Sequence, residues 1–310
     1  MQLLLLFPGQ GSQKPGMAKD LAEQYPAARA VFAEADAALG APLSSLCFEG
    51  PADELTRTHN AQPALLAHGA AVWAVVKERA ASHVVAAAGH SLGEFSAYHA
   101  AGALSLADAV RLVRRRGELM YETGVQRPGA MAAILGELQR PIDEICVEAS
   151  AAGVVVPANY NALEQIVISG EVAGVERGME LAKAAGAKRA MRLQVSGAFH
   201  SPLMQPAEDG LRAALDAAAW HEPHWPVYSN VTAAPTTAQA DARALLLRQL
   251  TSPVRWVAVI QAMAAAYPGA TFVELGPGNV LTGLLKRLAP NHTAKTCGTV
   301  GEVEALLAAL

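Results

Sequence analysis

A serine between two glycines is the residue of this chain with the clearest chemical potential. Residues 89–93 read Gly-His-Ser-Leu-Gly, a G-x-S-x-G pattern. A short apolar run over residues 84–89, typical of a buried strand, precedes the pattern, and a helical pattern follows it. This is the context of a nucleophile elbow, a tight strand-to-helix turn that places a serine hydroxyl beside main-chain N–H groups. The pattern predicts Ser91 as a nucleophile; the alternative is a glycine-rich turn with an incidental serine.

A serine nucleophile needs a base, and the chain has nine histidines. His200 follows a predicted strand, in a loop of the kind that commonly presents catalytic side chains. His90 lies in the elbow, where neighbouring residues point in different directions, so we expect it to pack or to support. The other seven fit solvated or packed histidines. No acidic residue has a clear claim as the partner of His200, because Glu208 and Asp209 fit a solvated helix face.

The elements that must position these residues alternate between short apolar runs and helical patterns. We expect strands over 2–7, 84–89, 227–230, 271–275 and 294–297, and helices over 21–39, 63–80, 92–101, 106–121, 238–250, 254–266, 280–288 and from 302. Ser105 is the expected N-cap of the helix over 106–121, with Asp108 three residues further on. Alternating strands and helices predict an α/β fold with buried parallel strands.

Residues from about 129 to 195 show a different order of elements. We expect a strand over 130–135, a helix over 141–152, strands over 154–158 and 165–169, a helix over 172–185 and a strand over 188–195. The order β-α-β-β-α-β is that of a ferredoxin-like unit. We therefore expect an inserted subdomain over 127–195 within a large domain formed by 1–126 and 196–310.

Composition fits a folded protein and argues against several functions. Of the 310 residues, 52% are hydrophobic and 17% charged, which excludes a disordered chain. The net charge of −4 and the absence of long basic runs argue against a nucleic-acid partner. Cys47, Cys146 and Cys297 are odd in number and form no C-x-x-C pattern, so we expect buried thiols in a reducing compartment and no structural metal. With no signal or membrane-spanning segment apparent, we expect a cytoplasmic protein.

Six motifs in order resemble those of the malonyl-CoA:acyl carrier protein transacylase family. They are Phe-Pro-Gly-Gln-Gly-Ser-Gln at 7–13, Gly-His-Ser-Leu-Gly-Glu at 89–94, Arg-Gly at 116–117, Gly-Ala-Phe-His at 197–200, Gln249 with Pro-Val at 253–254, and Glu-Leu-Gly-Pro-Gly at 274–278. The resemblance spans nearly the whole chain. It implies a hydrolase-like α/β domain that carries a ferredoxin-like insertion, in agreement with the element order.

The resemblance also implies roles for residues around the elbow. Ser91 is implied as the nucleophile and His200 as the general base, oriented by the backbone carbonyl of Gln249 with no acidic third member. A neutral carbonyl can fix the imidazole tautomer by accepting the Nδ1 proton. The backbone N–H groups of Gln10 and Leu92 are implied as the oxyanion hole.

Substrate recognition is implied by a second set of residues. Arg116 would hold the free malonyl carboxylate, although in isolation Arg114, Arg115 and Arg116 fit a charged helix face. The ring of Phe199 would restrict room for the extra methyl of a methylmalonyl group. Three more polar residues match positions near the cleft of the family, with turn and cap roles equally open: Gln62, Asn159 and Asn161.

The resemblance thus implies a ping-pong acyltransferase that uses malonyl-CoA as substrate and binds no cofactor. Its partner would be an acyl carrier protein. Basic residues of the insertion and the C-terminal region are candidates for docking it, with scattered solvated charges as the alternative: Lys188, Arg189, Arg192, Lys286 and Arg287. An acyl-thioester hydrolase on the same fold is the alternative activity, and a non-catalytic scaffold is a third hypothesis. Fatty-acid synthesis, a polyketide pathway supplied in trans and malonate decarboxylase all stay open.

Overall fold

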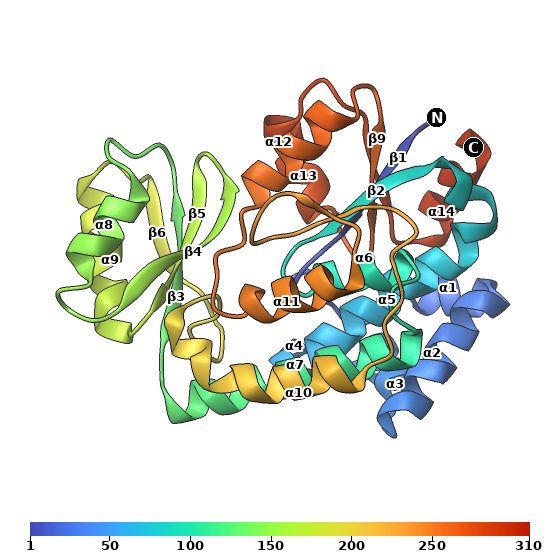
Figure 1. The fold of residues 1–310 in the computed structure, drawn as a ribbon, viewed down its shortest axis with the longest axis horizontal. Helices are drawn as coiled ribbons and strands as arrows, with labels where there is room; N and C mark the ends of the chain where they lie inside the picture. Colours follow the sequence, from blue (N-terminus) through green and yellow to red (C-terminus); the bar gives the residue numbers. More distant parts are fainter.

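A six-stranded sheet forms the centre of the larger of two bodies, on the right in Figure 1. The computed structural model describes all 310 residues. The strands, in the spatial order β10-β9-β1-β2-β7-β8, are β10 (Ala294–Cys297), β9 (Thr271–Leu275), β1 (Leu3–Phe7), β2 (Val84–Gly89), β7 (Val227–Tyr228) and β8 (Pro235–Thr236). All neighbours pair in parallel except β7 and β8. The predicted α/β class with buried parallel strands is confirmed.

Helices pack on both faces of this sheet. They are α1 (Lys19–Gln24), α2 (Pro26–Leu39), α3 (Leu43–Glu49), α4 (Ala52–Thr56), α5 (Thr58–Ala80), α6 (Gly93–Ala100), α7 (Leu106–Gln126), α10 (Glu208–Ala217), α11 (Gln239–Gln249), α12 (Trp256–Ala266), α13 (Val280–Leu288) and α14 (Val300–Ala309), with 3-10 turns at η1 (Ala81–His83) and η2 (Pro202–Ala207). Alternate residues of β1 point to opposite faces. Leu3 and Leu5 join a core that includes α2, α5 and α7, whereas Leu4 and Leu6 join one that includes α12 and α13. Burial on both faces explains the unbroken apolar sequence of β1.

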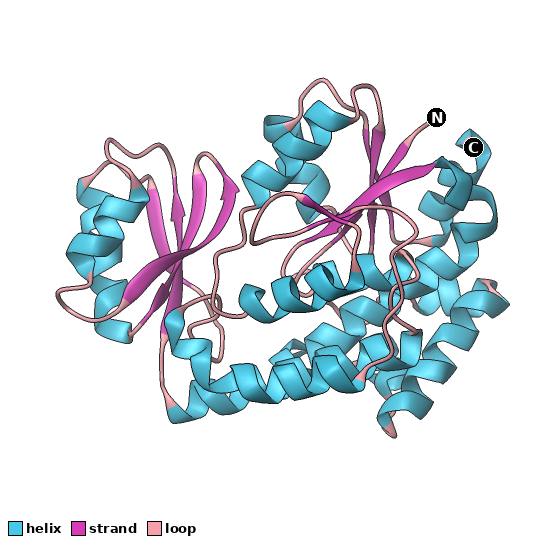
Figure 2. Ribbon diagram, in the orientation of Figure 1, coloured by secondary structure: helices cyan, strands magenta, loops and turns pink.

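The smaller body, on the left in Figure 1, contains a four-stranded antiparallel sheet. Its strands, in the order β4-β5-β3-β6, are β4 (Val155–Ala162), β5 (Gln165–Gly170), β3 (Ala130–Leu135) and β6 (Arg189–Arg192). Helices α8 (Ile142–Ala149) and α9 (Val172–Ala184) cover the sheet face that points away from the larger body (Figure 2). The chain order β3-α8-β4-β5-α9-β6 is the predicted β-α-β-β-α-β order.

One strand of the smaller body also makes hydrogen bonds to the larger one. The main-chain N–H of Tyr160 donates to the carbonyl of Val254 at 2.9 Å, and the N–H of Val254 donates to the carbonyl of Ala158 at 2.8 Å. These bonds form a short parallel bridge between Asn159 and Val254. The bridge fixes the position of β4, and with it Asn159 and Asn161, relative to the parallel sheet.

Several predicted boundaries are wrong, chiefly where proline lies near a helix. The single helix predicted over 21–39 is two helices, because Tyr25 is extended and Pro26 starts α2. Helix α5 begins at Thr58 and contains Pro63, which was expected to start it. Helices α3 and α4 were not predicted, and strands β6 and β7 are shorter than expected. The N-cap at Ser105 is confirmed, because its Oγ accepts the N–H of Asp108 at 3.0 Å.

The three cysteines are buried and unpaired, as expected. Burial raises the pKa of each thiol to about 12, so all three are protonated near neutral pH. No helix has the length and apolar character needed to cross a membrane. No three His, Cys, Asp or Glu side chains are grouped so that they could hold a metal ion.

Candidate active site

The turn between β2 and α6 gives Ser91 an unusual backbone conformation. Its φ is +53°, in the left-handed region that residues other than glycine rarely adopt. The flanking glycines allow the turn to be this tight: a Cβ at Gly89 would lie 1.9 Å from the carbonyl of Gly93, and a Cβ at Gly93 would lie 2.1 Å from the carbonyl oxygen of Phe7. The G-x-S-x-G sequence is therefore required for close contact between α6, β2 and β1.

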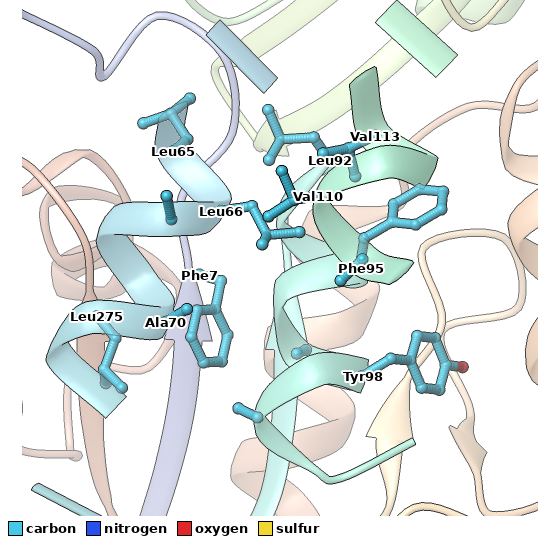
Figure 3. Close-up of a cluster of buried hydrophobic side chains, with 14 of the residues drawn as sticks. Phe7, Leu65, Leu66, Ala70, Leu92, Phe95, Tyr98, Val110, Val113 and Leu275 are labelled. Atoms are coloured by element: carbon cyan, nitrogen blue, oxygen red, sulfur yellow. The ribbon is translucent and has the colours of Figure 1, made fainter. Parts of the chain in front are cut away.

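Apolar packing beneath the turn holds α6 in place. Leu92, Phe95 and Tyr98 belong to one buried hydrophobic cluster with Leu66 of α5 and Val110 of α7, and Figure 3 shows these side chains around α6. Leu92, the N-cap of α6, is 1% exposed, and Phe95 and Tyr98 of the helix are fully buried. Fully buried side chains in a close-packed core have little freedom to shift, so the helix gives the serine a rigid support.

Ser91 and His200 form a hydrogen-bonded pair. Ser91 Oγ lies 2.8 Å from His200 Nε2, and His200 Nδ1 lies 2.9 Å from the main-chain oxygen of Gln249. Because the carbonyl can only accept, Nδ1 carries the proton and Nε2 accepts the serine hydroxyl. His200 itself has φ +57°, and its side chain is almost fully buried. The two residues, 109 positions apart, thus have the geometry of a nucleophile and its base.

The surroundings keep the His200 imidazole neutral. Burial is the largest cause and the nearby Arg116 guanidinium the second, and together they lower the pKa of His200 to about 3. The hydrogen bond to the Gln249 carbonyl opposes this shift. A neutral imidazole is the form that can take a proton from a hydroxyl, so the base is available across the physiological pH range.

Arg116 is a buried cation whose hydrogen-bonded acceptors are all neutral. Its side chain is 1% exposed. Nη1 donates to Gln62 Oε1 at 2.7 Å, while Nη2 donates to Gln249 Oε1 at 3.0 Å and to Ser91 Oγ at 3.1 Å. The guanidinium carbon lies 5.4 Å from the centre of the Phe95 ring. Burial lowers the pKa of Arg116 only to about 10, so the group stays charged near neutral pH.

One edge of this guanidinium reaches Ser91. Nε of Arg116 has no hydrogen-bond partner, and it lies on the same edge as Nη2, which reaches Ser91. Two parallel N–H donors on one edge match the two oxygens of a carboxylate. The carboxyl of Glu94 acts on Arg116 only at a distance, and a buried cation whose hydrogen bonds go to neutral acceptors alone is costly, so the arrangement favours an anionic ligand next to Ser91.

Two main-chain N–H groups near the nucleophile have no acceptor in the protein. They belong to Gln10, in the turn after β1, and Leu92, directly after the nucleophile. The side chain of Gln10 is held at 3.3 Å by Thr58 Oγ1. Both residues line the same cavity as Ser91. These N–H groups are available to a developing oxyanion.

A cavity of about 330 Å³ lies between the two bodies of the protein. Eight of the ten predicted site residues line it: Gln10, Ser91, Leu92, Arg116, Asn159, Asn161, Phe199 and His200. Gln62 and Gln249 do not line it but contact Arg116 from behind. Apolar side chains complete the wall, among them Met131 of β3 and Val167 of β5. The four-stranded sheet therefore closes one side of the site.

The two asparagines of β4 differ in their side-chain partners. Asn161 Oδ1 accepts a hydrogen bond from His90 Nε2 at 2.7 Å, and the His90 ring lies 5.5 Å from the ring of Trp256. Supporting contacts were the role expected of His90. Asn159 is 6% exposed, and its side chain has no hydrogen-bond partner in the protein. Asn159 is therefore the asparagine with donors and acceptors free for a ligand.

Two residues of the site were missed from the sequence. Asn230, two residues after the end of β7, accepts the N–H of Ser91 through Oδ1 at 2.8 Å and donates from Nδ2 to the carbonyl of Gly89 at 2.8 Å. Glu94 is fully buried in α6, where Oε2 accepts the N–H of Asn230 at 3.0 Å and Nε2 of Gln249 at 2.7 Å. The position of Asn230 just past a parallel strand is the signal that could have found it, because ligands bind at that end of such sheets.

Comparison with known proteins identifies the family of this chain. Residues 4–306 match the family model of the acyl transferase domain. The malonyl CoA-acyl carrier protein transacylase of Bacillus subtilis is 50% identical over 95% of this chain and 92% of its own length, and that of Escherichia coli K12 is 44% identical over 100% and 99%. The crystal structure of the acyl-carrier-protein S-malonyltransferase of Bartonella henselae superposes with a TM-score of 0.95 at 45% identity, covering 100% of this chain and 99% of that one. A malonyl-transacylase in complex with a type II PKS acyl-carrier protein also has a TM-score of 0.95, at 40% identity over all of both chains. The chain is therefore an acyltransferase that belongs to the malonyl CoA-acyl carrier protein transacylase family.

Proposed function

We propose that this protein transfers the malonyl group of malonyl-CoA to the thiol of an acyl carrier protein through an ester on Ser91. The observation that carries the proposal is the pair of contacts at Ser91 Oγ, with His200 Nε2 at 2.8 Å and Arg116 Nη2 at 3.1 Å. A neutral base and a cation aimed at one hydroxyl fit an acyl donor that carries a negative charge. The names of the relatives, malonyl CoA-acyl carrier protein transacylases, support this donor and this acceptor.

In the first half-reaction, His200 Nε2 takes the proton of the Ser91 hydroxyl while Oγ attacks the thioester carbonyl. The N–H groups of Gln10 and Leu92 donate to the oxyanion, and removal of such a donor typically costs about 3 kcal/mol of transition-state stabilisation. When the C–S bond breaks, His200 returns the proton to the CoA sulfur. The products are free CoA and malonyl-Ser91.

In the second half-reaction, the carrier thiol occupies the place of CoA. His200 accepts the thiol proton, the sulfur attacks the ester carbonyl, and the C–O bond to Ser91 breaks as Oγ regains the proton. Throughout both steps the Gln249 carbonyl keeps the Nδ1 proton on the far side of the ring. A carbonyl stabilises imidazolium less than a carboxylate would, and burial and the Arg116 charge also disfavour the protonated ring. The imidazolium intermediate is therefore short-lived.

Arg116 and Phe199 would select the acyl donor. The carboxylate of the malonyl group would bind the Nε and Nη2 edge of Arg116, which fixes the thioester carbonyl beside Ser91. Phe199 is 6% exposed and lines the cavity, where its ring would crowd a methyl on the α-carbon of the donor. One methyl group is typically worth about 1 to 3 kcal/mol of discrimination.

The carrier protein would approach across the smaller body. Lys188 and Arg189 are exposed and form no ion pair, whereas Arg192 lies 3.7 Å from Glu176 and Arg287 lies 3.6 Å from Glu164. Surface cations that form no ion pair within the protein can bind an acidic partner without breaking an existing ion pair. Lys286 is also exposed and forms no ion pair, but only Lys188 and Arg189 belong to the smaller body, so these two are the proposed docking cations.

A burst experiment tests the two-step mechanism. Without carrier protein, malonyl-CoA should release one equivalent of CoA per active enzyme and then stop, and addition of holo carrier protein should restart the release. Continuous release of CoA together with free malonate would identify a thioester hydrolase instead. Absence of any release without carrier protein would contradict the ester intermediate.

A further inference from the structure

A buried carboxylate beneath the site has no part in the steps above. Glu94 is fully buried, and the two groups that donate to it, the N–H of Asn230 and Nε2 of Gln249, are neutral. Its Oε1 has no hydrogen-bond partner. Burial raises the pKa of this carboxyl to about 7. A carboxylate in such surroundings destabilises the fold, so its presence calls for a function.

Both donors to Glu94 also hold the main chain of the proposed nucleophile. Asn230 Oδ1 accepts the N–H of Ser91 at 2.8 Å, and Gln249 Nε2 donates to the carbonyl of Ser91 at 3.0 Å. Ser91 has φ +53°, and a residue in that region costs on the order of 1–3 kcal/mol unless its surroundings fix it. The peptide groups on both sides of Ser91 are thus held by the side chains of two residues that each donate to Glu94, Asn230 through its main-chain N–H and Gln249 through Nε2.

Gln249 extends the same network to the other two proposed functional groups. Its side-chain Oε1 accepts Nη2 of Arg116 at 3.0 Å, and its main-chain oxygen accepts Nδ1 of His200 at 2.9 Å. A rotation of the Gln249 side chain would release Arg116 and the Ser91 carbonyl together. The 2.7 Å hydrogen bond that Gln249 Nε2 donates to Glu94 opposes that rotation.

We propose that Glu94 is a positioning residue of this site, whose carboxylate fixes Gln249 and Asn230 and through them holds Ser91 and Arg116 in the geometry that transfer requires. This inference rests on the proposed function of Ser91. A carboxylate is suited to the task because its hydrogen bonds are charge-assisted, and are roughly twice as strong as those of a neutral acceptor.

The ionised form of Glu94 is the one that would work. Glu94 interacts electrostatically with two charged or titratable groups, Arg116 of α7 and Tyr98 of its own helix. The groups that face it from the loop after β7 and from α11 are neutral. Because the pKa of Glu94 is raised to about 7 and that of His200 is lowered to about 3, the two groups titrate in separate ranges. Acylation should therefore rise with Glu94 ionisation near pH 7.

Glu94→Gln tests the proposal because the amide keeps the size of the side chain and removes its charge. Glu274→Gln is the matched control, since Glu274 is also a fully buried glutamate that accepts neutral donors, the main-chain N–H groups of Leu281 and Thr282, and it lies outside the network. Thermal melting of both variants and of the wild type establishes folding. Rapid-quench intact mass then gives the rate of Ser91 acylation from pH 5.5 to 8.5.

We expect Glu94→Gln to lower the rate constant for Ser91 acylation more than it weakens substrate binding. Glu94→Gln should acylate about 10- to 100-fold more slowly at pH 8, because a small displacement of reacting groups has effects of this size. KM should change less, since Gln62 still holds Arg116. The wild type and Glu274→Gln should show a rise near pH 7 that is absent in Glu94→Gln, whose rate should match the acid limit of the wild type.

Glu94→Gln should slow the modification of Ser91 by a neutral serine-reactive phosphonate by the same factor as acylation by malonyl-CoA. The phosphonate needs a correctly placed Ser91 but makes no use of Arg116. Equal acylation rates in Glu94→Gln and Glu274→Gln, or a rise near pH 7 that persists in Glu94→Gln, would overturn the proposal. If Glu94→Gln does not fold, the wild type decides: a flat rate from pH 6 to pH 8 refutes the inference. If the wild type forms no malonyl-Ser91 at any pH, it is the proposed function that fails.

Discussion

Replacement of Arg116 by Met should change which acyl donor the protein prefers. Methionine fills most of the space of the buried arginine and removes its charge and its donors. Arg116 has no anionic hydrogen-bond partner, and its Nε and Nη2 edge reaches Ser91, so a malonyl carboxylate would make two charge-assisted bonds to it. An acetyl group would make none.

The magnitude follows from those two bonds. A hydrogen bond to a charged group contributes about 1.5 to 3 kcal/mol, so the pair contributes about 3 to 6 kcal/mol. At about 1.4 kcal/mol for each factor of ten, the ratio of kcat/KM for malonyl-CoA to that for acetyl-CoA should fall by about two to four orders of magnitude.

The assay is the rate of Ser91 acylation by each donor, measured on Arg116→Met and on the wild type, with thermal melting as the folding control. Most of the loss should fall on malonyl-CoA, while acetyl-CoA should be used as well as before or better. Equal losses with both donors would refute the reasoning, because Arg116 would then serve Ser91 or the fold and not the carboxylate.

Three further predictions concern other parts of the site. The pKa of His200 is about 3 in the folded state and near 6.5 in the unfolded state, so the folded state binds fewer protons between these values and its free energy of unfolding falls as the pH falls. In urea unfolding, His200→Gln should lose about 3 kcal/mol less of this free energy than the wild type between pH 7 and pH 4. Phe199→Ala should raise kcat/KM for methylmalonyl-CoA relative to malonyl-CoA by about 10-fold or more in a competition assay, and no change would show that the ring does not select. Reversing the charges of Lys188 and Arg189 should raise KM for the carrier protein at low salt and leave acylation by malonyl-CoA unchanged, and an unaltered KM would place docking elsewhere.

Local sequence was sufficient where one short segment determines a conformation. The elbow could be predicted because Gly89 and Gly93 lie at the spacing that a tight strand-to-helix turn needs, and both approach backbone too closely for a side chain. Strands β2, β3 and β9 begin and end where their apolar runs do. By contrast, the break at Tyr25 and Pro26 was overlooked because the apolar spacing continues across it.

The arginine triplet shows where periodicity is insufficient. Arg114 donates to Asn60 Oδ1 at 2.6 Å, Arg115 pairs with Glu118 at 3.2 Å on the surface, and Arg116 is buried beside Ser91. A rotation of about 100° between helical neighbours requires the three to face differently, but does not say which of them faces the cleft. Only resemblance to a family indicated Arg116.

The support beneath the site could not be predicted because it depends on residues far apart in the chain. Glu94 contacts Asn230 and Gln249, which are 136 and 155 positions away. Nothing in the composition near any of the three indicates such a contact, since a glutamate early in a helix also fits a favourable charge at the helix N-terminus. Only the main-chain carbonyl of Gln249 was expected to take part in the site. Its side chain makes three further hydrogen bonds, to Arg116, the Ser91 carbonyl and Glu94.

Intact-mass analysis of the protein mixed with malonyl-CoA, followed by peptide mapping, tests the central claim most directly. We predict one malonyl group per chain, attached to Ser91, lost on addition of holo carrier protein and absent from Ser91→Ala. Retention of the adduct in Ser91→Ala, or its attachment to another residue, would contradict the proposed mechanism.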